Sequence, residues 1–232
     1  MITVQRTNSP FSQVNATATG SILLDVRYYK GNPWVCFSPF FPWKNIPIRF
    51  SFPDTAVSVA AMMEGLRVFN NTGNNASLFQ STSHKEIRHN ATSGSTIGFS
   101  QGIGSHIILT EEDAKKELLY PTYKWVLDYK MQNFIVYLRE QAQSRDITIL
   151  DYQKGTKGME LYTGDISIGE LIKSYITGTA PYTDVFEFKE EHIYFTNYKR
   201  ISGSRTVKTH IPGKIPPLPC QKDSQLLLPL SW

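Results

Sequence analysis

The sequence predicts a single α+β domain, and three observations lead to this prediction. Hydrophobic residues make up 41% of the 232-residue chain and charged residues 19%, a composition typical of a globular protein that buries a core. Stretches with apolar residues three and four positions apart, typical of helices, are interspersed with short apolar runs typical of buried strands. The length fits one large domain or one domain with an extension, and we expect a single core.

The domain is expected to cover residues 21–198, between two segments of different composition. Residues 1–20 are rich in Asn, Ser and Thr and are expected to form a flexible arm. Residues 199–232 combine cations with prolines and are expected to form a basic, extended tail. These cations either face solvent or contact phosphates, and the second interpretation would make nucleic acid a partner. A net charge of +4 is too small to indicate nucleic acid by itself.

The first part of the domain is expected to contain a strand, an aromatic loop and a helix. Residues 22–26 form a short apolar run that is typical of a buried strand. Residues 32–53 are expected to form an ordered loop, because prolines at this density forbid a helix. The spacing of apolar residues that follows predicts an amphipathic helix, capped by Asp54 or Thr55 and ending near Phe69.

A glycine-rich segment covers residues 94–104. It places Gly94, Gly98, Gly102 and Gly104 among Ser and Thr residues. Backbone amides in such a segment could face a bound anion, and the alternative is a flexible surface loop.

Two helices and a strand are expected next. Thr110 precedes three acidic residues, which is typical of a capped helix start. Pro121 suits the first turn of a longer helix that runs towards Arg139. Residues 147–151 are expected to form a strand.

The last predicted elements are a third helix and a β-hairpin. Asp165 or Ser167 is expected to open the helix, which stops at Gly178. Residues 185–196 alternate between apolar and polar around a charged centre, which predicts the hairpin.

The sequence predicts no metal site, membrane span or export signal. Cys36 and Cys220 lie far apart without a metal-ligand spacing, and His84, His89 and His106 also lack such a spacing. The first fifteen residues contain no apolar stretch of the kind found in signal peptides, and no segment reaches about 18 apolar residues. We therefore expect a cytoplasmic protein with no cofactor and no membrane partner.

Several motifs follow one another in a recognisable order. They are PWVCFSPFFP at residues 33–42, IPI at 46–48, SVAAMMEGLRVF at 58–69, PTYKWVL at 121–127 and LDY at 150–152. This order resembles the NADAR (YbiA-like) superfamily, and looks closest to an uncharacterised bacterial branch of it. The resemblance covers roughly residues 23–182 and implies a single NADAR/YbiA-like domain, with the hairpin and the tail outside it.

The resemblance implies chemistry on an N-glycosidic bond, because NADAR-like proteins are associated with ADP-ribose compounds and with cleavage of ribosyl-to-base bonds. Cleavage at an anomeric carbon requires a carboxylate. The family glutamate falls at Ala60 in this chain, and Glu64 lies one turn later on the same helix face. We therefore expect Glu64 to be the catalytic residue. A salt-bridged or surface glutamate is the alternative.

A set of further residues is expected to bind the ligand. Arg67 and the glycine amides would hold phosphate, an aromatic side chain from the loop would stack on the base, and a carboxylate after a strand is a common site residue. The aromatic side chains would alternatively fill the core. The expected ligand-binding residues are Arg67, Trp34, Phe37, Ser38, Phe40, Gly98, Gly102, Gly104, Asp151 and Asp165.

Two departures from the family pattern accompany Ala60. Gly164 to Gly169 lacks the histidine of the related helix start, and Gly98 is followed by Phe99 where relatives tend to carry Gly-His. The function expected from the resemblance is binding, and possibly hydrolysis, of an N-ribosyl or ADP-ribose-type compound. The alternative is a catalytically inactive member that binds a ligand or another protein.

Overall fold

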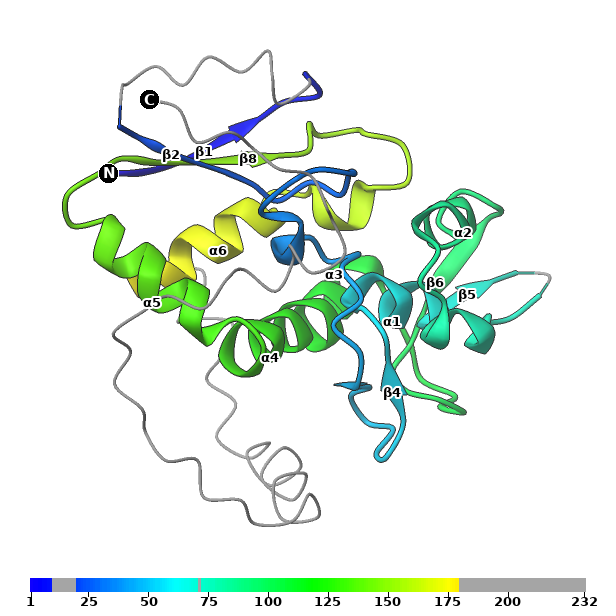
Figure 1. The fold of residues 1–232 in the computed structure, drawn as a ribbon. Coiled ribbons are helices and arrows are strands. Elements are labelled where there is room, and N and C mark those ends of the chain that lie inside the picture. Colours follow the sequence, from blue (N-terminus) through cyan, green and yellow to red (C-terminus); the bar gives the residue numbers. More distant parts are fainter. Residues whose placement is uncertain (10–19, 71, 180–232) are drawn as a thin grey trace, which may run out of the picture. The chain divides into compact units, whose positions relative to one another are not determined.

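The structure is a computed structural model that describes residues 1–9, 20–70 and 72–179. The chain divides into two compact units, Met1–Phe186 and Glu187–Trp232, and all described residues belong to the first. The first unit mixes helices and strands, in agreement with the predicted α+β class (Figure 1). The hairpin and the basic tail predicted from the sequence lie outside the described residues.

A three-stranded sheet is built from segments far apart in the chain. Its strands are β1 (Ile2–Arg6), β8 (Ile147–Asp151) and β2 (Ile22–Asp25), and both outer strands run parallel to β8 in the centre. Helix α6 (Ile168–Thr177) packs along one face of the sheet (Figure 1). Because all three strands are parallel, their carboxyl ends meet at one edge, where ligands often bind in such sheets.

The expectation of a flexible arm over residues 1–20 is wrong for its first residues. Ile2–Arg6 forms β1 and pairs with β8 along its whole length. The terminal ammonium group of Met1 also donates to Asp146 at 2.6 Å. Three β-branched residues open this segment, and such residues favour a strand when a neighbouring strand offers hydrogen bonds. Asn-rich and Ser-rich composition further along the arm masked that local signal.

Helix α1 (Val59–Leu66) is shorter and more buried than the sequence predicted. Ser58 caps it by accepting a hydrogen bond from the Ala61 amide, while Thr55–Ala56 forms strand β4, paired with β3 (Ile46–Pro47). The chain leaves the helix after Leu66 and enters β5. Every residue of α1 is buried, so the prediction of an amphipathic helix with a solvent face is wrong.

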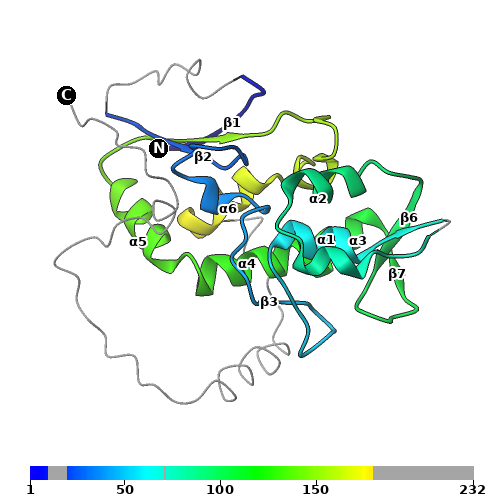
Figure 2. The same ribbon diagram turned by 45° about the vertical axis from the view of Figure 1, so that its right-hand side comes forward.

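A second three-stranded sheet is antiparallel and lies beside α1. It contains β5 (Arg67–Phe69), β6 (Thr96–Ser100) and β7 (Ile108–Leu109), in that order. Between β5 and β6 the chain forms a 3₁₀ helix (Ala76–Gln80) and α2 (His84–Asn90). Figure 2 shows α2 next to α1, and the two helices are in contact.

The longer helix expected to run towards Arg139 is divided in two. Thr110 caps α3 (Glu111–Ala114) as predicted, and one π-helical turn (Lys115–Leu119) joins α3 to α4 (Tyr120–Tyr129). The helix then breaks at Lys130 and Met131 before α5 (Gln132–Gln141). Buried apolar residues on both α4 and α5 produced one continuous helical pattern in the sequence.

The carboxyl-terminal elements of the unit agree with their predicted limits. β8 covers Ile147–Asp151, and α6 begins after a Ser167 cap and ends at Gly178, whose φ of 68° is the left-handed conformation that favours glycine. Two further 3₁₀ helices cover Val35–Phe37 and Glu160–Tyr162. In the ranges that the structure describes, every helix is too short or too polar to cross a membrane.

Candidate functional site

Glu64 lies in the last turn of α1 and forms an ion pair with Arg67. The Arg67 Nε donates to Glu64 Oε2 and its Nη2 donates to Oε1, both at 2.7 Å. Glu64 is 1% exposed and Arg67 is 8% exposed. The backbone turns from helix to strand between the two residues, which places the guanidinium group beside the carboxylate. Both carboxylate oxygens are therefore occupied by one planar partner.

Two neighbouring elements, α2 and β6, hold this ion pair in place. Asn90 of α2 donates to the Glu64 carbonyl oxygen at 3.2 Å and to its Oε2 at 3.3 Å. Arg67 Nη1 donates to Thr96 Oγ1 at 3.3 Å, and its guanidinium carbon lies 4.7 Å from the centre of the Phe99 ring. Burial alone would lower the pKa of Arg67, but the hydrogen bonds and charge of Glu64 raise it overall. Arg67 is therefore charged, and its contacts and those of Glu64 join α1, α2 and β6.

Tyr162 lies close to the same carboxylate. Its side chain is buried, and its hydroxyl oxygen has no hydrogen-bond partner among the described residues. Desolvation, followed by the charge of Glu64, raises the pKa of Tyr162 well above its ordinary value. The hydroxyl is therefore neutral at physiological pH.

The ion pair corresponds to the alternative expectation for Glu64, a salt-bridged glutamate, and it engages the guanidinium of Arg67 that was expected to hold phosphate. Their polar atoms face each other, and neither residue lines the pocket described below. To act as a base or nucleophile, Glu64 would first have to lose its hydrogen bonds with Arg67. The arrangement is that of a structural ion pair.

The aromatic loop contributes mainly to the core. Phe37 is fully buried and packs against Trp34 and Phe134, and its carbonyl oxygen accepts a hydrogen bond from Tyr123 at 2.5 Å. Trp34 is half-buried beside it. Phe37 is therefore part of the core, and its expected contact with a ligand finds no support in this position.

Ser38 and Phe40 are also buried. The Ser38 hydroxyl accepts a weak hydrogen bond from the Phe40 amide at 3.4 Å. The Phe40 ring makes edge contacts with Tyr162 and His84, at centroid distances of 5.4 and 4.7 Å. Neither residue lines the pocket directly. Phe40 instead supports His84, which does line it.

The expected glycine cradle does not form. Gly98 lies in β6, where a Cβ atom would come within 2.4 Å of the Leu109 carbonyl oxygen, and a Cβ at Gly102 would lie 2.8 Å from Ser51 Oγ. That hydroxyl also accepts the hydrogen bond of the Ile103 amide. These two glycines allow close packing within the protein. Gly104 has a φ of 73° and faces open space, as expected for a glycine in a turn.

Two buried acidic residues lie at the carboxyl edge of the parallel sheet, and other groups of the protein donate hydrogen bonds to both carboxylates. Asp151 accepts from the amides of Gly169 and Tyr152, both at 2.7 Å, and it anchors the start of α6. Desolvation raises the pKa of Asp151 although these hydrogen bonds lower it. Asp25 is paired with Arg27 through two hydrogen bonds of 2.8 and 2.6 Å. Both carboxylate oxygens of Asp151 thus accept hydrogen bonds from the protein, and its expected contact with a ligand finds no support in this position.

Asp165 lies on the surface, with a side chain that is 96% exposed, and it pairs with Lys154 at 3.1 Å. The hydrogen bond from Lys154 lowers the pKa of Asp165. It does not cap α6, since Ser167 does so, and it lines no described pocket. The prediction that Asp165 binds a ligand finds no support in this position.

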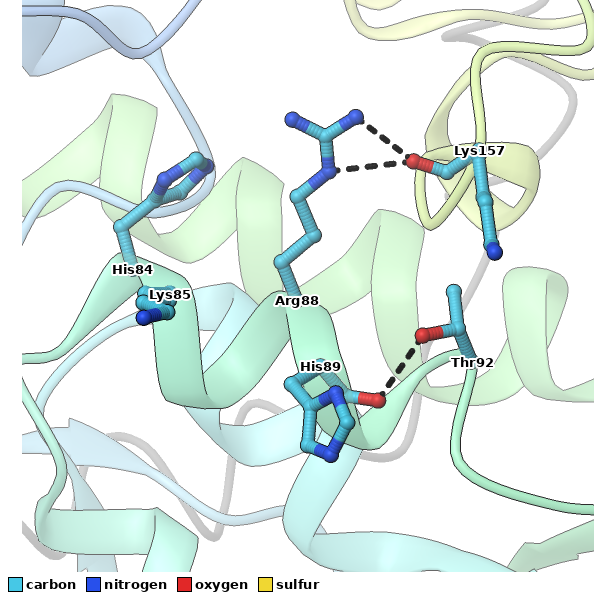
Figure 3. A pocket seen from close by; sticks show the side chains of 6 residues that line it. All are labelled: His84, Lys85, Arg88, His89, Thr92 and Lys157. Atoms are coloured by element: carbon cyan, nitrogen blue, oxygen red, sulfur yellow. Dashed lines mark hydrogen bonds between the residues drawn. The ribbon is translucent and has the colours of Figure 1, made fainter.

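A pocket of about 280 Å³ lies on α2, outside the set of predicted residues (Figure 3). Four of its residues come from α2, one follows that helix, and one comes from the loop after β8. They are His84, Lys85, Arg88, His89, Thr92 and Lys157. All but Thr92 are basic or imidazole side chains. This lining favours an anion.

Arg88 fixes one wall of the pocket. Its Nε and Nη2 donate to the Lys157 carbonyl oxygen at 3.0 and 2.7 Å, which ties α2 to the loop after β8 (Figure 3). Gly158 follows with a φ of 74°, and a Cβ atom there would lie 2.9 Å from Arg88 Cγ. The glycine therefore allows the loop to approach the arginine.

His84 forms the aromatic side of the pocket. Its ring stacks on Tyr28 with centroids 4.7 Å apart and touches the edge of Phe40. Burial, and then the charge of Arg88, lower the pKa of His84. Its Nε2 is buried and has no hydrogen-bond partner in the described part of the chain. His84 is therefore neutral at physiological pH.

The sequence contained a partial signal for this pocket. His84, Lys85, Arg88 and His89 stand at positions i, i+1, i+4 and i+5, which gather on one side of a helix. Within the described ranges no cluster of three or more His, Cys, Asp or Glu residues could hold a metal. Lys157 could not be found this way, since it lies 69 residues beyond Arg88.

Comparison with known proteins gives one match. No curated protein and no solved structure matches the chain. A family model, described as a family of unknown function (DUF6939), matches residues 6–171, which include the ion pair, all of α2 and the loop that carries Lys157. The match covers well over half of the chain. The chain therefore belongs to the family of unknown function DUF6939.

Proposed function

We propose that this protein binds a nucleotide-derived compound of the ADP-ribose type without cleaving its ribosyl-to-base bond. This is the inactive, ligand-binding alternative raised by the resemblance to NADAR-like proteins. The observation that carries the proposal is the ion pair between Glu64 and Arg67, which occupies both oxygens of the expected catalytic carboxylate.

The energetic cost of freeing Glu64 supports binding over hydrolysis. Separating a buried ion pair leaves an uncompensated charge, at a cost of about 3–5 kcal/mol. A barrier increase of that size slows a reaction by roughly two to four orders of magnitude. At the position where NADAR-like proteins carry a glutamate, this chain has Ala60, so no second carboxylate lies on this helix face.

The pocket on α2 supports an anionic ligand. Its lining contains three permanent cations and no carboxylate. Phosphorylated nucleotides carry the opposite charge, and their phosphates are commonly bound by Arg and Lys side chains.

Isothermal titration calorimetry with ADP-ribose, combined with chromatography of the mixture after incubation, tests the proposal. We expect saturable binding and an unchanged ligand. Release of a free base from ADP-ribosylated or phosphoribosylated compounds would instead identify a hydrolase, and an absence of any binding would remove this ligand class.

A further inference from the structure

We infer that the pocket lined by Lys85, Arg88 and Lys157 is a phosphate subsite, which binds the phosphate or diphosphate group of its ligand and leaves the remainder outside. This inference rests on the proposed function only for the identity of the whole ligand. The site itself follows from the charge, size and construction of the pocket.

The positive charge of the pocket is not neutralised locally. Neither Lys85 nor Lys157 has a carboxylate within ion-pair distance among the described residues, and both are exposed. The two nearest acids in the sequence are engaged elsewhere. Glu86 accepts a hydrogen bond from the Ser81 hydroxyl at 2.6 Å, and Glu160 accepts one from the Gly158 amide at 3.1 Å. An anion is thus attracted without competition from an internal partner.

Arg88 supplies a fixed donor between two adjustable cations. Its Nε and Nη2 are held by the Lys157 carbonyl oxygen, while Nη1 has no hydrogen-bond partner in the described ranges. In Figure 3 the Lys157 side chain extends towards Thr92, on the side of the pocket opposite His84 and Lys85. A rigid guanidinium flanked by flexible ammonium groups suits a tetrahedral oxyanion, which presents oxygens in several directions.

The size of the pocket decides how much of a ligand it holds. Sites that enclose a small organic molecule have volumes of roughly 300–1,000 Å³. At about 280 Å³ the pocket lies just below this range, so it accommodates a phosphate or diphosphate better than a whole nucleotide. Residues of α2, the turn after it and one loop form the pocket. This surface is smaller than the interface that a nucleic acid requires, so a small phosphorylated molecule is the better occupant.

The test compares two double variants that remove the same charge. Lys85→Ala/Lys157→Ala removes both flexible cations of the pocket. Lys116→Ala/Lys154→Ala is the matched control, because these lysines pair with Glu112 and Asp165 and do not line the pocket. All four lysines lie at the surface, and thermal unfolding of each variant verifies that the fold is retained.

Calorimetry with inorganic pyrophosphate and with ADP-ribose is carried out on the wild type and on both variants. We expect the pocket variant to bind both ligands about tenfold or more weakly than the wild type. The control variant should bind them with affinities within about twofold of the wild type. Competition between the two ligands is also expected. Pyrophosphate binding that is lost in the pocket variant, without any ADP-ribose binding, would support the subsite and overturn the proposed function.

The opposite outcomes overturn the subsite. ADP-ribose binding that is equal in both variants would retain the proposed function and place the phosphates elsewhere. The inference of a phosphate subsite would be wrong if the wild type did not bind pyrophosphate, or if both variants lowered the affinity equally. Tight binding of single-stranded nucleic acid with a steep salt dependence, together with no competition by pyrophosphate, would replace the small ligand with a polymer.

Discussion

Arg67 and Glu64, three residues apart, form a bidentate ion pair at the junction between a fully buried helix and the strand that follows it. Asn90 adds hydrogen bonds to the same carboxylate residue from α2. The residue expected to perform chemistry is therefore part of the internal framework behind the basic pocket. The same helix, α2, contacts Glu64 on one side and lines the pocket on the other.

Removing one charge of this pair is expected to destabilise the fold strongly. Glu64→Gln leaves Arg67 charged and buried, and Arg67→Met leaves the carboxylate in the same position. We expect each to lower the free energy of unfolding by about 3 kcal/mol, measured by urea denaturation.

The double variant Glu64→Gln/Arg67→Met provides the control for that prediction. It removes both charges, so its loss of stability is expected to be much smaller than the sum of the two single losses. Strict additivity would mean that the two side chains do not stabilise each other.

Gly65 is expected to be essential for the packing of α1. A Cβ atom at this position would lie 2.3 Å from the ring of Phe79, which is buried in the 3₁₀ helix that follows β5. Gly65→Ala is therefore expected to lower the free energy of unfolding by about 1–3 kcal/mol, although alanine is the better helix former.

A matched substitution and a second-site change test this steric explanation. Gly164→Ala meets only the flexible end of Lys115, so we expect a change within about 0.5 kcal/mol. Phe79→Leu removes part of the ring that obstructs the new methyl group, so it should restore part of the stability lost in Gly65→Ala. Equal effects of the two alanine substitutions would contradict the contact with Phe79.

His84 is expected to make stability fall in mild acid. Burial and the charge of Arg88 lower its pKa in the folded state below the ordinary value of 6.5. Above about pH 6.5 the imidazole is neutral in both states, and its contribution to stability is complete. As the pH falls from 6.5 towards the folded pKa, the unfolded chain binds the proton more tightly and stability decreases.

Urea denaturation between pH 7.5 and about 5 measures this effect. His84→Phe retains an aromatic ring between Tyr28 and Phe40 but has no proton to bind, so its profile should be flatter than that of the wild type. Parallel profiles for the two proteins would show that His84 does not titrate differently on folding.

The elements that the sequence predicted well carry complete local signals. Residues 147–151 combine β-branched and apolar residues in a short run, and α6 has both a serine cap and a left-handed glycine at its end. Helix α2 also has a serine cap, Ser83, but Ile87 is its only apolar side chain, so no repeating apolar pattern marks its buried face.

The burial of Glu64 depends on the tertiary structure. Apolar spacing predicted one buried face for α1, but α2, β6 and the 3₁₀ helix before α2 cover the remaining faces. Small residues such as Ala60 and Gly65 permit this close approach, and they appear neutral in a sequence pattern. The basic pocket likewise requires Lys157, which only the folded chain brings to Arg88.

The proposed function is binding of an ADP-ribose-type compound, with its glycosidic bond left intact. Calorimetry of the wild type with ADP-ribose, followed by chromatography of the same sample and of a parallel incubation with an ADP-ribosylated base, tests it most directly. We expect a saturable binding isotherm and unchanged compounds in both samples. Release of free base by the wild type would overturn the proposed function.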